Sequence, residues 1–306
     1  MKPPKVGIVI LTYNSQSYIR NCLESIVKSS YSNFLCVIID NNSSDQTIHI
    51  VKKKFPKIHM IKNEKNEGYA AGNNIGVRYL LDQKCDYILL LNPDTIISSS
   101  LLRECVDVFT KKKSIGIVGP IITYAHEPDR IWFSGGYFNR LFCYTKHSRM
   151  NKKILYPILN SQFSTLNFFS TDFITGACMM IRKEVFKKVG LLPEEYFMYW
   201  EDVDFCERVK KAGYKIMLLK KPLVRHAISA ASGYIGSNVL SPFQAYYYGR
   251  NPIIYIKNQV HGWQKIPNYL GQFLIRFPFY SLLLIKSGKP KNILSYIHGM
   301  YDGVLY

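Results

Sequence analysis

Three acidic residues stand close together in the stretch WEDVDF: Glu201, Asp202 and Asp204. They fall in the first turn of a predicted helix, where the helix dipole stabilises negative charge. That electrostatic effect alone explains an acidic helix start, so a purely structural role stays open for each of them. An ionised carboxylate at this position could also act as a general base. Tyr199 and Trp200 precede the acids and could form an aromatic platform for a sugar ring.

Another carboxylate, Asp94, follows the apolar run DYILLL in the stretch NPDT. Carboxylate oxygens suit a hard divalent cation, which could bridge two phosphate oxygens and neutralise a departing nucleoside diphosphate. An Asp after a strand is usually a turn or cap residue, but three other polar strand ends favour the functional interpretation here. His226, after LLKKPLVR, could be a second metal ligand, although a single His more often packs or caps.

Polar clusters also follow the three earlier apolar runs: TYNS (Thr12–Ser15), DNNSSD (Asp40–Asp45) and NEKNEGYAAGNN (Asn63–Asn74). Asp40 could cap the next helix, or it could accept hydrogen bonds from a base or ribose. The glycines of NEGYAAGNNIG permit close backbone approach, so the helix that follows could bind a diphosphate at its N-terminus. A simple glycine-rich turn is the alternative.

The elements that position these clusters alternate along the first half of the chain. Short apolar runs predict strands at Val6–Leu11, Phe34–Asp40, Ile58–Ile61 and Asp86–Leu91, and helical spacing predicts helices at Ser17–Lys28, Asp45–Phe55, Ala70–Leu81 and Ser98–Phe109. This alternation indicates an α/β fold with a mostly parallel central sheet flanked by helices. Ligands bind at the carboxyl edge of such sheets, so we expect the four clusters to converge there.

The second half is less regular. Thr123–Thr171 is loop-rich and aromatic, whereas Asp172–Gly190 predicts a strand and a short helix that stops at Gly190. Trp200–Ile216 predicts a helix that stops at Gly213, followed by a strand.

From about Ser237 the chain becomes aromatic and aliphatic, in YYYGRNPIIYIKN and YLGQFLIRFPFYSLLLIK. Arg276 and Pro278 interrupt the second stretch, which therefore predicts an interfacial amphipathic segment rather than a transmembrane helix. A buried helix pair is the alternative. Residues 236–306 carry seven basic side chains and one acidic side chain, which suits an anionic cytoplasmic leaflet.

The whole composition is that of a basic globular protein, with 306 residues, 47% hydrophobic residues and a net charge of +19. The charge favours an anionic partner, but no zinc-finger spacing or RNP-like signature supports nucleic acid. The seven scattered cysteines lack any CxxC pair and predict reduced thiols of a cytoplasmic protein. The six apolar residues VGIVIL are too few for a signal peptide.

The ordered motifs VGIVILTYNS, CVIIDNNSSDQT, NEGYAAGNNIG, LLLNPDT, FITGACMMIRKEVFKKVG, YWEDVDFCERVKKAGYKI and VRH resemble the family 2 glycosyltransferases of the GT-A fold. Their joint order over about Lys5–Gly233 is most similar to the bacterial rhamnosyltransferase-like members. The resemblance implies a GT-A-type, Rossmann-like fold with a helical, aromatic C-terminal extension. It divides the chain into a nucleotide-sugar-binding half (1–122), an acceptor-binding and catalytic half (123–236) and a C-terminal, membrane-associating region (237–306).

The same resemblance implies a role for each site residue. The donor-binding residues would be Thr12, Tyr13, Asn14, Asp40, Asn41, Asn66, Gly68, Asn73 and Asn92. Asp94, at the end of the family's DxD motif, and His226 would bind Mg²⁺ or Mn²⁺, and Asp202 would be the catalytic base. Tyr199, Trp200 and Glu201 would lie toward the acceptor. Asn92 replaces the first acid of DxD and brings no charge, so we expect weaker metal binding.

The implied reaction is an inverting transfer from a nucleotide-diphospho-sugar to a hydroxyl group of a glycan or lipid-linked acceptor. A dTDP-rhamnose-like donor is favoured over UDP-sugars. The reaction would belong to bacterial surface polysaccharide synthesis, such as that of O-antigen. The protein would be cytoplasmic and bound to the inner face of the cell membrane. One alternative is a sugar nucleotidyltransferase, which would need a glycine-rich basic loop where TYNSQSYIR stands. The other is an inactive glycan- or lipid-binding scaffold of the same fold.

Overall fold

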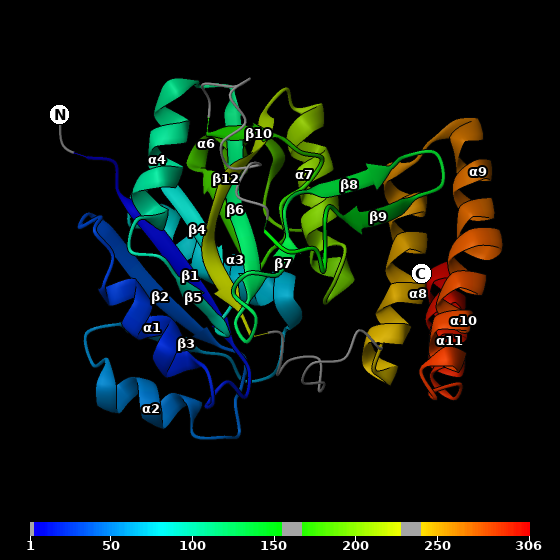
Figure 1. Ribbon diagram of the computed structural model, residues 1–306, viewed down its shortest axis with the longest axis horizontal. Coiled ribbons are helices and arrows are strands. Elements are labelled where there is room, and N and C mark those ends of the chain that lie inside the picture. The colour runs from blue at the N-terminus through cyan, green and yellow to red at the C-terminus, as the bar shows by residue number, and fades with distance from the viewer. Residues whose placement is uncertain (1–2, 155–166, 228–239) are drawn as a thin grey trace.

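The computed structural model describes residues 3–154, 167–227 and 240–306. Within these ranges a ten-stranded sheet forms the centre, in the order β10-β12-β6-β11-β4-β1-β2-β3, with β5 paired to β12 and β7 to β6 (Figure 1). The first strands are β1 (Val6–Thr12), β2 (Phe34–Asp40), β3 (His59–Lys62) and β4 (Tyr87–Leu91). β1 runs parallel to β2 and β4, and β2 runs parallel to β3. The four predicted strands are therefore confirmed.

Four helices connect these strands, as the periodicity predicts: α1 (Ile19–Val27), α2 (Thr47–Lys54), α3 (Gly68–Asp82) and α4 (Leu101–Lys111). α1 shows why they form, because Ile19, Cys22, Leu23 and Ile26 recur every three or four residues and are all buried. α3 begins two residues earlier than predicted, at Gly68. The helix starts therefore stand beside the polar ends of the strands.

The remaining strands make the other half of the sheet mixed in direction. They are β5 (Thr95–Ile97), β6 (Ile115–Tyr124), β7 (Ile131–Phe133), β10 (Phe168–Ser170), β11 (Cys178–Arg182) and β12 (Lys215–His226). β8 (Gly136–Asn139) and β9 (Tyr144–His147) form a separate antiparallel pair. β11 lies antiparallel between β4 and β6, while β12 is parallel to β6. The region predicted as loop-rich contains β7 to β10, whose three or four residues are too few to show a period.

Of the two predicted limits between regions, one falls within a strand and the other outside the described residues. Residue 122 lies inside β6, so the limit between the two predicted halves would divide one strand; the division itself stays a prediction. The limit between residues 236 and 237 lies outside the described residues.

Two further helices and a short turn complete this part: α6 (Lys183–Val189), η1 (Glu194–Tyr196) and α7 (Glu201–Lys211). Gly190 ends α6 with φ of 78°, and Gly213 follows α7 with φ of 87°. Both glycine stop signals are confirmed, since these left-handed conformations favour glycine.

The C-terminal helices gather on the side of the molecule away from β1, β2 and β3 (Figure 1). They are α8 (Pro242–Gln259), η3 (Gly262–Gln264), α9 (Lys265–Leu270), the π-helix η4 (Gly271–Arg276), α10 (Phe277–Lys286) and α11 (Asn292–Leu305). α8 joins two cores: Ile254 and Ile256 belong to the main one, and Ile253 packs with Tyr296 and Met300 in a smaller one. The stretch YYYGRNPIIYIKN is therefore a buried helix.

Candidate active site

The tips of β1 and β2 are tied together by side-chain hydrogen bonds. Thr12 Oγ1 donates to Asp40 Oδ1 over 3.0 Å, and the Ser43 amide donates to Asp40 Oδ2 over 2.9 Å. Asp40 is fully buried and its two oxygens hold the two loops together. It does not cap the next helix, since α2 begins at Thr47 with no side-chain cap. Its reading of a base stays a prediction. Tyr13, which is 41% exposed, and Asn14, whose φ is 48°, form the rim beside it.

A network of amides connects β2 to the start of α3. Asn41 Nδ2 donates to Asn66 Oδ1 over 3.1 Å and to the Gly68 carbonyl over 3.0 Å. Asn63 Nδ2 donates to Asn41 Oδ1 over 2.7 Å. Sequence reasoning missed Asn63, although its place at the end of β3 could have indicated it. Asn41, Asn66 and Gly68 are thus brought together, as predicted for a donor-binding loop.

Asn73 makes its side-chain hydrogen bond within α3, and its predicted role at the donor stays a prediction. It is buried, and its Nδ2 donates to the Tyr69 carbonyl over 2.9 Å, one turn earlier in α3. Asn73 therefore stabilises the helix in this structure, because the helical spacing directs it into the protein rather than toward the loop.

Asp94 and His226 meet at the far side of the same edge. Their carboxylate Oδ1 and imidazole Nε2 lie 3.0 Å apart, and both side chains are nearly buried. β12 pairs with β5 so that His226 stands opposite Thr95, next to Asp94. Within the described residues no group of three or more His, Cys, Asp or Glu gathers for a metal. The Asp94 carboxylate suits Mg²⁺ or Mn²⁺, which use few protein ligands together with phosphate oxygens, whereas the His226 imidazole suits a transition metal better than Mg²⁺.

Asp202 is held by two backbone amides at the start of α7. The Gly176 amide donates to its Oδ2 over 3.1 Å, and the Val203 amide donates to its Oδ1 over 2.8 Å. Burial raises the pKa of Asp202 to about 6. Burial, and then the charge of Asp202, raise the pKa of Glu201 well above its usual range, and its Oε2 has no hydrogen-bond partner. Asp202 accepts two backbone hydrogen bonds while Glu201 Oε2 accepts none, so Asp202 is the carboxyl whose ionised form this site favours.

One turn, residues 175–177, connects Asp202 with the loops of the donor side. The Asn92 amide, two residues before Asp94, donates to the Ala177 carbonyl over 3.0 Å. Tyr69 Oη, at the start of α3, donates to the Gly176 carbonyl over 2.7 Å, while the Gly176 amide binds Asp202. Segments far apart in the chain thus meet at the carboxyl edge of the sheet, as the positions of the polar clusters predict.

Of the two aromatic residues before α7, Trp200 is buried in the core and Tyr199 is partly exposed. Trp200 is only 5% exposed and packs against Tyr255, and the Arg276 guanidinium lies 5.4 Å from its ring centre. This corrects the prediction of a sugar platform at Trp200, because stacking a sugar needs one accessible ring face and this ring is almost wholly covered. Tyr199 is partly exposed and its hydroxyl accepts a hydrogen bond from Gln244 over 3.1 Å.

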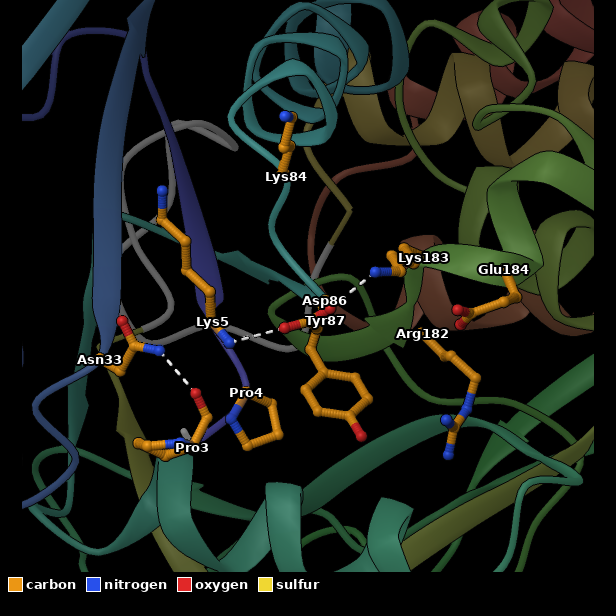
Figure 2. Close-up of a pocket in the computed structure, with 10 residues that line it drawn as sticks. All are labelled: Pro3, Pro4, Lys5, Asn33, Lys84, Asp86, Tyr87, Arg182, Lys183 and Glu184. Carbon is orange, nitrogen blue, oxygen red and sulfur yellow. Dashed lines mark hydrogen bonds and ion pairs between the residues drawn. The ribbon is translucent and has the colours of Figure 1, made fainter. Parts of the chain in front are cut away.

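A cavity of about 480 Å³ lies elsewhere, between Lys5, Asn33, Asp86 and Arg182 (Figure 2). Lys5, Asn33 and Asp86 immediately precede β1, β2 and β4. The cavity therefore stands at the amino edge of the parallel strands, opposite the site described above. Lys183 and the Lys5 amide both bond Asp86 there, as the dashed lines of Figure 2 show.

Comparison with known proteins decides the family. Residues 7–190 match the model described as Glycosyl transferase family 2. The chain belongs to this family. The predicted family and its rhamnosyltransferase-like character are confirmed, and so is the glycosyltransferase class.

Three relatives illustrate the range of this glycosyltransferase family. The chain is 31% identical over 218 residues to the low-salt glycan biosynthesis hexosyltransferase Agl10 of Haloferax volcanii, a match that covers 69% of this chain and 63% of that relative. It is 27% identical over 256 residues to the dTDP-rhamnosyl transferase RfbF of Shigella flexneri, covering 82% and 80%. It is 22% identical over 278 residues to an N-acetylglucosaminyl-diphospho-decaprenol L-rhamnosyltransferase of Mycobacterium tuberculosis, covering 85% and 86%.

Solved structures of other glycosyltransferases share the architecture. TarS of S. aureus superposes with a TM-score of 0.57 at 18% identity, over 98% of this chain and 81% of that one. GalNAc-T7, crystallised with UDP, GalNAc and Mn²⁺, gives a TM-score of 0.60 at 14% identity, over 94% and 58%. At these identities the likeness shows the fold alone, and it confirms the predicted GT-A fold.

Proposed function

We propose that this glycosyltransferase transfers a sugar from a nucleotide-diphospho-sugar to a hydroxyl group of a glycan or lipid-linked acceptor in bacterial surface polysaccharide synthesis, with inversion at the anomeric carbon. The observation that carries the proposal is the placement of the Asp202 carboxylate, which is bonded by the turn that also binds the donor-side loops. The name of the S. flexneri relative supports a dTDP-rhamnose donor, and the complex of TarS with UDP-GlcNAc supports UDP-sugars as the second choice.

The reaction follows from this geometry as one displacement. The acceptor hydroxyl gives its proton to Asp202, and its oxygen bonds to the anomeric carbon as the bond to the diphosphate breaks on the opposite face. Burial raises the pKa of the neighbouring Glu201 and so disfavours a second negative charge beside the base. Asp94 and His226 would hold Mg²⁺ or Mn²⁺, which when bound supplies positive charge to the leaving nucleoside diphosphate.

The direct test measures release of nucleoside diphosphate by the purified protein from dTDP-rhamnose and from UDP-glucose. Asp202→Asn should lower kcat by about 10²–10⁴-fold, the usual contribution of a general base, while donor KM changes little. Asp86→Asn, at the opposite edge of the sheet, is the matched control and should keep wild-type turnover. Formation of a nucleoside triphosphate and a sugar 1-phosphate from either donor when pyrophosphate is added would instead favour the nucleotidyltransferase. No turnover of either donor by the wild type would favour the inactive scaffold.

We also propose that the C-terminal helices lie on an anionic membrane face. The helix that runs through α9, η4 and α10 buries polar side chains and exposes apolar ones. Asn268, Gln272 and Arg276, four residues apart, are buried. The Asn268 amide donates to the Arg140 and Leu141 carbonyls over 3.1 Å each, and the Gln272 amide donates to the Phe142 and Cys143 carbonyls over 3.1 and 2.9 Å.

The opposite side of this helix presents apolar side chains outward. Ile266, Leu270 and Leu274, also four residues apart, are 64%, 48% and 68% exposed. Exposed Lys286 and Lys291 follow at its end, and residues 236–306 contain one acidic side chain against seven basic ones. An apolar side bordered by lysines fits the interface of an anionic bilayer. In the described part of the chain, the helices are too short or too polar for a membrane span, so the proposed contact lies along the surface.

Flotation with lipid vesicles tests this contact. The protein should float with vesicles that contain phosphatidylglycerol, and less with pure phosphatidylcholine. Leu270→Glu combined with Leu274→Glu should reduce the floating fraction at least about tenfold, whereas Tyr137→Glu, at an exposed apolar position on β8, should not. Equal flotation of both variants would contradict the proposal. So would a wild-type dimer in light scattering that the double variant makes monomeric, because a second copy would then cover the surface.

A further inference from the structure

The loop between η1 and α7 has an unusual backbone. Phe197, Tyr199 and Trp200 have φ of 59°, 68° and 77°, and none of them is glycine. A left-handed conformation costs a residue with a side chain about 1–2 kcal/mol. Three such residues within four positions persist only where surrounding contacts hold them. The loop ends directly at Glu201 and Asp202, so whatever holds it also sets the start of α7.

The side chain that holds this loop comes from the C-terminal region. Asn251 on α8 is fully buried, and its Nδ2 lies within hydrogen-bond distance of three loop carbonyls: Tyr196 (3.0 Å), Met198 (2.8 Å) and Tyr199 (2.8 Å). Its neighbour Arg250 donates from Nη1 to the Glu195 carbonyl over 3.0 Å and to Asn251 Oδ1 over 3.1 Å. The RN pair of the stretch YYYGRNPIIYIKN thus binds the backbone of the whole loop.

The loop also bonds to the start of α3, which belongs to the predicted donor-binding region. The Phe197 carbonyl accepts a hydrogen bond from the Tyr69 amide, next to Gly68. The Trp200 carbonyl accepts one from the Asp204 amide over 2.9 Å, in the first turn of α7. The loop is therefore fixed between three elements, with α3 on one side, α8 on the other and α7 at its end.

We propose that Asn251 is a positioning residue of the transfer reaction, which acts through this loop to aim Asp202 at the acceptor. The inference rests on the proposed role of Asp202. Without the amide of Asn251 the carbonyls of Tyr196, Met198 and Tyr199 lose this partner, and the loop can relax toward ordinary conformations. Asp202 then shifts relative to the donor, and a displacement of about 1 Å can cost about 10²-fold in rate.

The chain offers a matched control in Asn268. Asn268 is also buried, and its Nδ2 also lies near three carbonyls, those of Arg140 (3.1 Å), Leu141 (3.1 Å) and Gln264 (2.8 Å). These carbonyls belong to the β8–β9 turn and to the end of η3, not to the loop before Asp202. Asn251→Ala and Asn268→Ala therefore remove the same chemistry from two places.

The experiment compares both variants in detergent, with release of nucleoside diphosphate and hydrogen exchange of residues 196–202 as readouts. Asn251→Ala should lower kcat about 10–10²-fold with donor KM within about twofold of wild type, and should speed exchange of the loop. Asn268→Ala should leave both near wild type. Asn251→Ser, which keeps one donor, should fall between, and it replaces the alanine variant if that fails to fold.

Two results would overturn the inference: an equal loss of kcat in the Asn251 and Asn268 variants, or fast exchange of the loop in Asn251→Ala with unchanged kcat. A wrong proposed function is distinguishable, because the wild type itself would then fail to turn over the donors while the exchange difference between the variants remained.

Discussion

Replacing Asp202 by Asn should make the protein slower and more stable at the same time. Burial raises the pKa of this carboxyl from 3.8 to about 6. A shift of about two units corresponds to about 3 kcal/mol by which the charged form destabilises the folded state. Asn keeps an acceptor for the Gly176 amide, but its own amide would face the Val203 amide, at a cost of about 1 kcal/mol. We therefore expect a net gain of about 2 kcal/mol at pH 7.5.

The sign of the effect depends on pH in a defined way. The folded state binds the proton of Asp202 more tightly than the unfolded state does, so stability falls as pH rises from about 4 to 6 and the full cost is present above 6. Urea unfolding of Asp202→Asn should thus show the gain at pH 7.5 and none at pH 4. The wild-type kcat should rise between about pH 5 and 7, around the folded-state pKa of about 6, to a plateau about tenfold above its value at pH 5, because only the ionised base accepts a proton.

Asp86→Asn is the control for this prediction. Partial burial opposes ionisation of Asp86, but the hydrogen bonds from Lys183 and the Lys5 amide prevail and lower its pKa. Asp86→Asn should therefore destabilise the protein at pH 7.5 and leave the pH dependence of kcat unchanged. Equal stability of Asp202→Asn and wild type at both pH values, together with a kcat that is flat between pH 5 and 7, would refute the assignment of Asp202 as a buried, ionised base.

Two further substitutions test the contacts around the site. Gly68→Ala should lower the free energy of unfolding in urea by at least about 2 kcal/mol and lower kcat, because at φ of 81° its Cβ would lie 2.6 Å from the Phe197 carbonyl oxygen. Gly213→Ala, with φ of 87° and nothing within 4 Å, should cost only the backbone strain of about 1 kcal/mol. Equal losses of stability in the two variants would contradict the contact between Gly68 and the Phe197 loop. Gly176→Ala should lower kcat about tenfold, because its Cβ would lie 2.5 Å from Tyr69 Oη while its amide bonds Asp202. Adding Tyr69→Phe removes that hydroxyl and should restore part of the lost kcat. If the double variant regains no activity, this explanation is wrong.

The sequence predicts the elements whose side chains repeat and misses those that depend on single contacts. β1 to β4 and α1 to α4 have enough apolar residues to show a period, and their polar ends therefore indicate the site. β7 to β10 are too short for this. Trp200 shows the opposite problem, since an aromatic residue beside an acid suits a sugar platform equally well until Arg276 and Tyr255 are seen to cover it.

The roles of Asn251 and Gly176 could not be predicted for a physical reason. Both act on or through backbone groups of distant segments, and a lone Asn in an aromatic helix or a glycine in a turn has no periodicity or spacing that reveals its partner. The helix through α9, η4 and α10, which buries its polar side chains, is a similar case. Its sequence shows alternating polar and apolar positions, but only the carbonyls of residues 140–143 explain why the polar side faces inward.

The most direct test of the shared site is calorimetric titration of dTDP and UDP, with and without Mg²⁺, into wild type, Asp94→Asn and Asp202→Asn. If both carboxylates serve one cleft with the divided roles proposed, Asp94→Asn should lose the Mg²⁺-dependent part of the affinity, at least about tenfold, while Asp202→Asn binds the nucleotide like wild type but does not turn over its sugar donor. Nucleotide binding that is indifferent to Mg²⁺ and to Asp94, or full turnover by Asp202→Asn, would contradict the account.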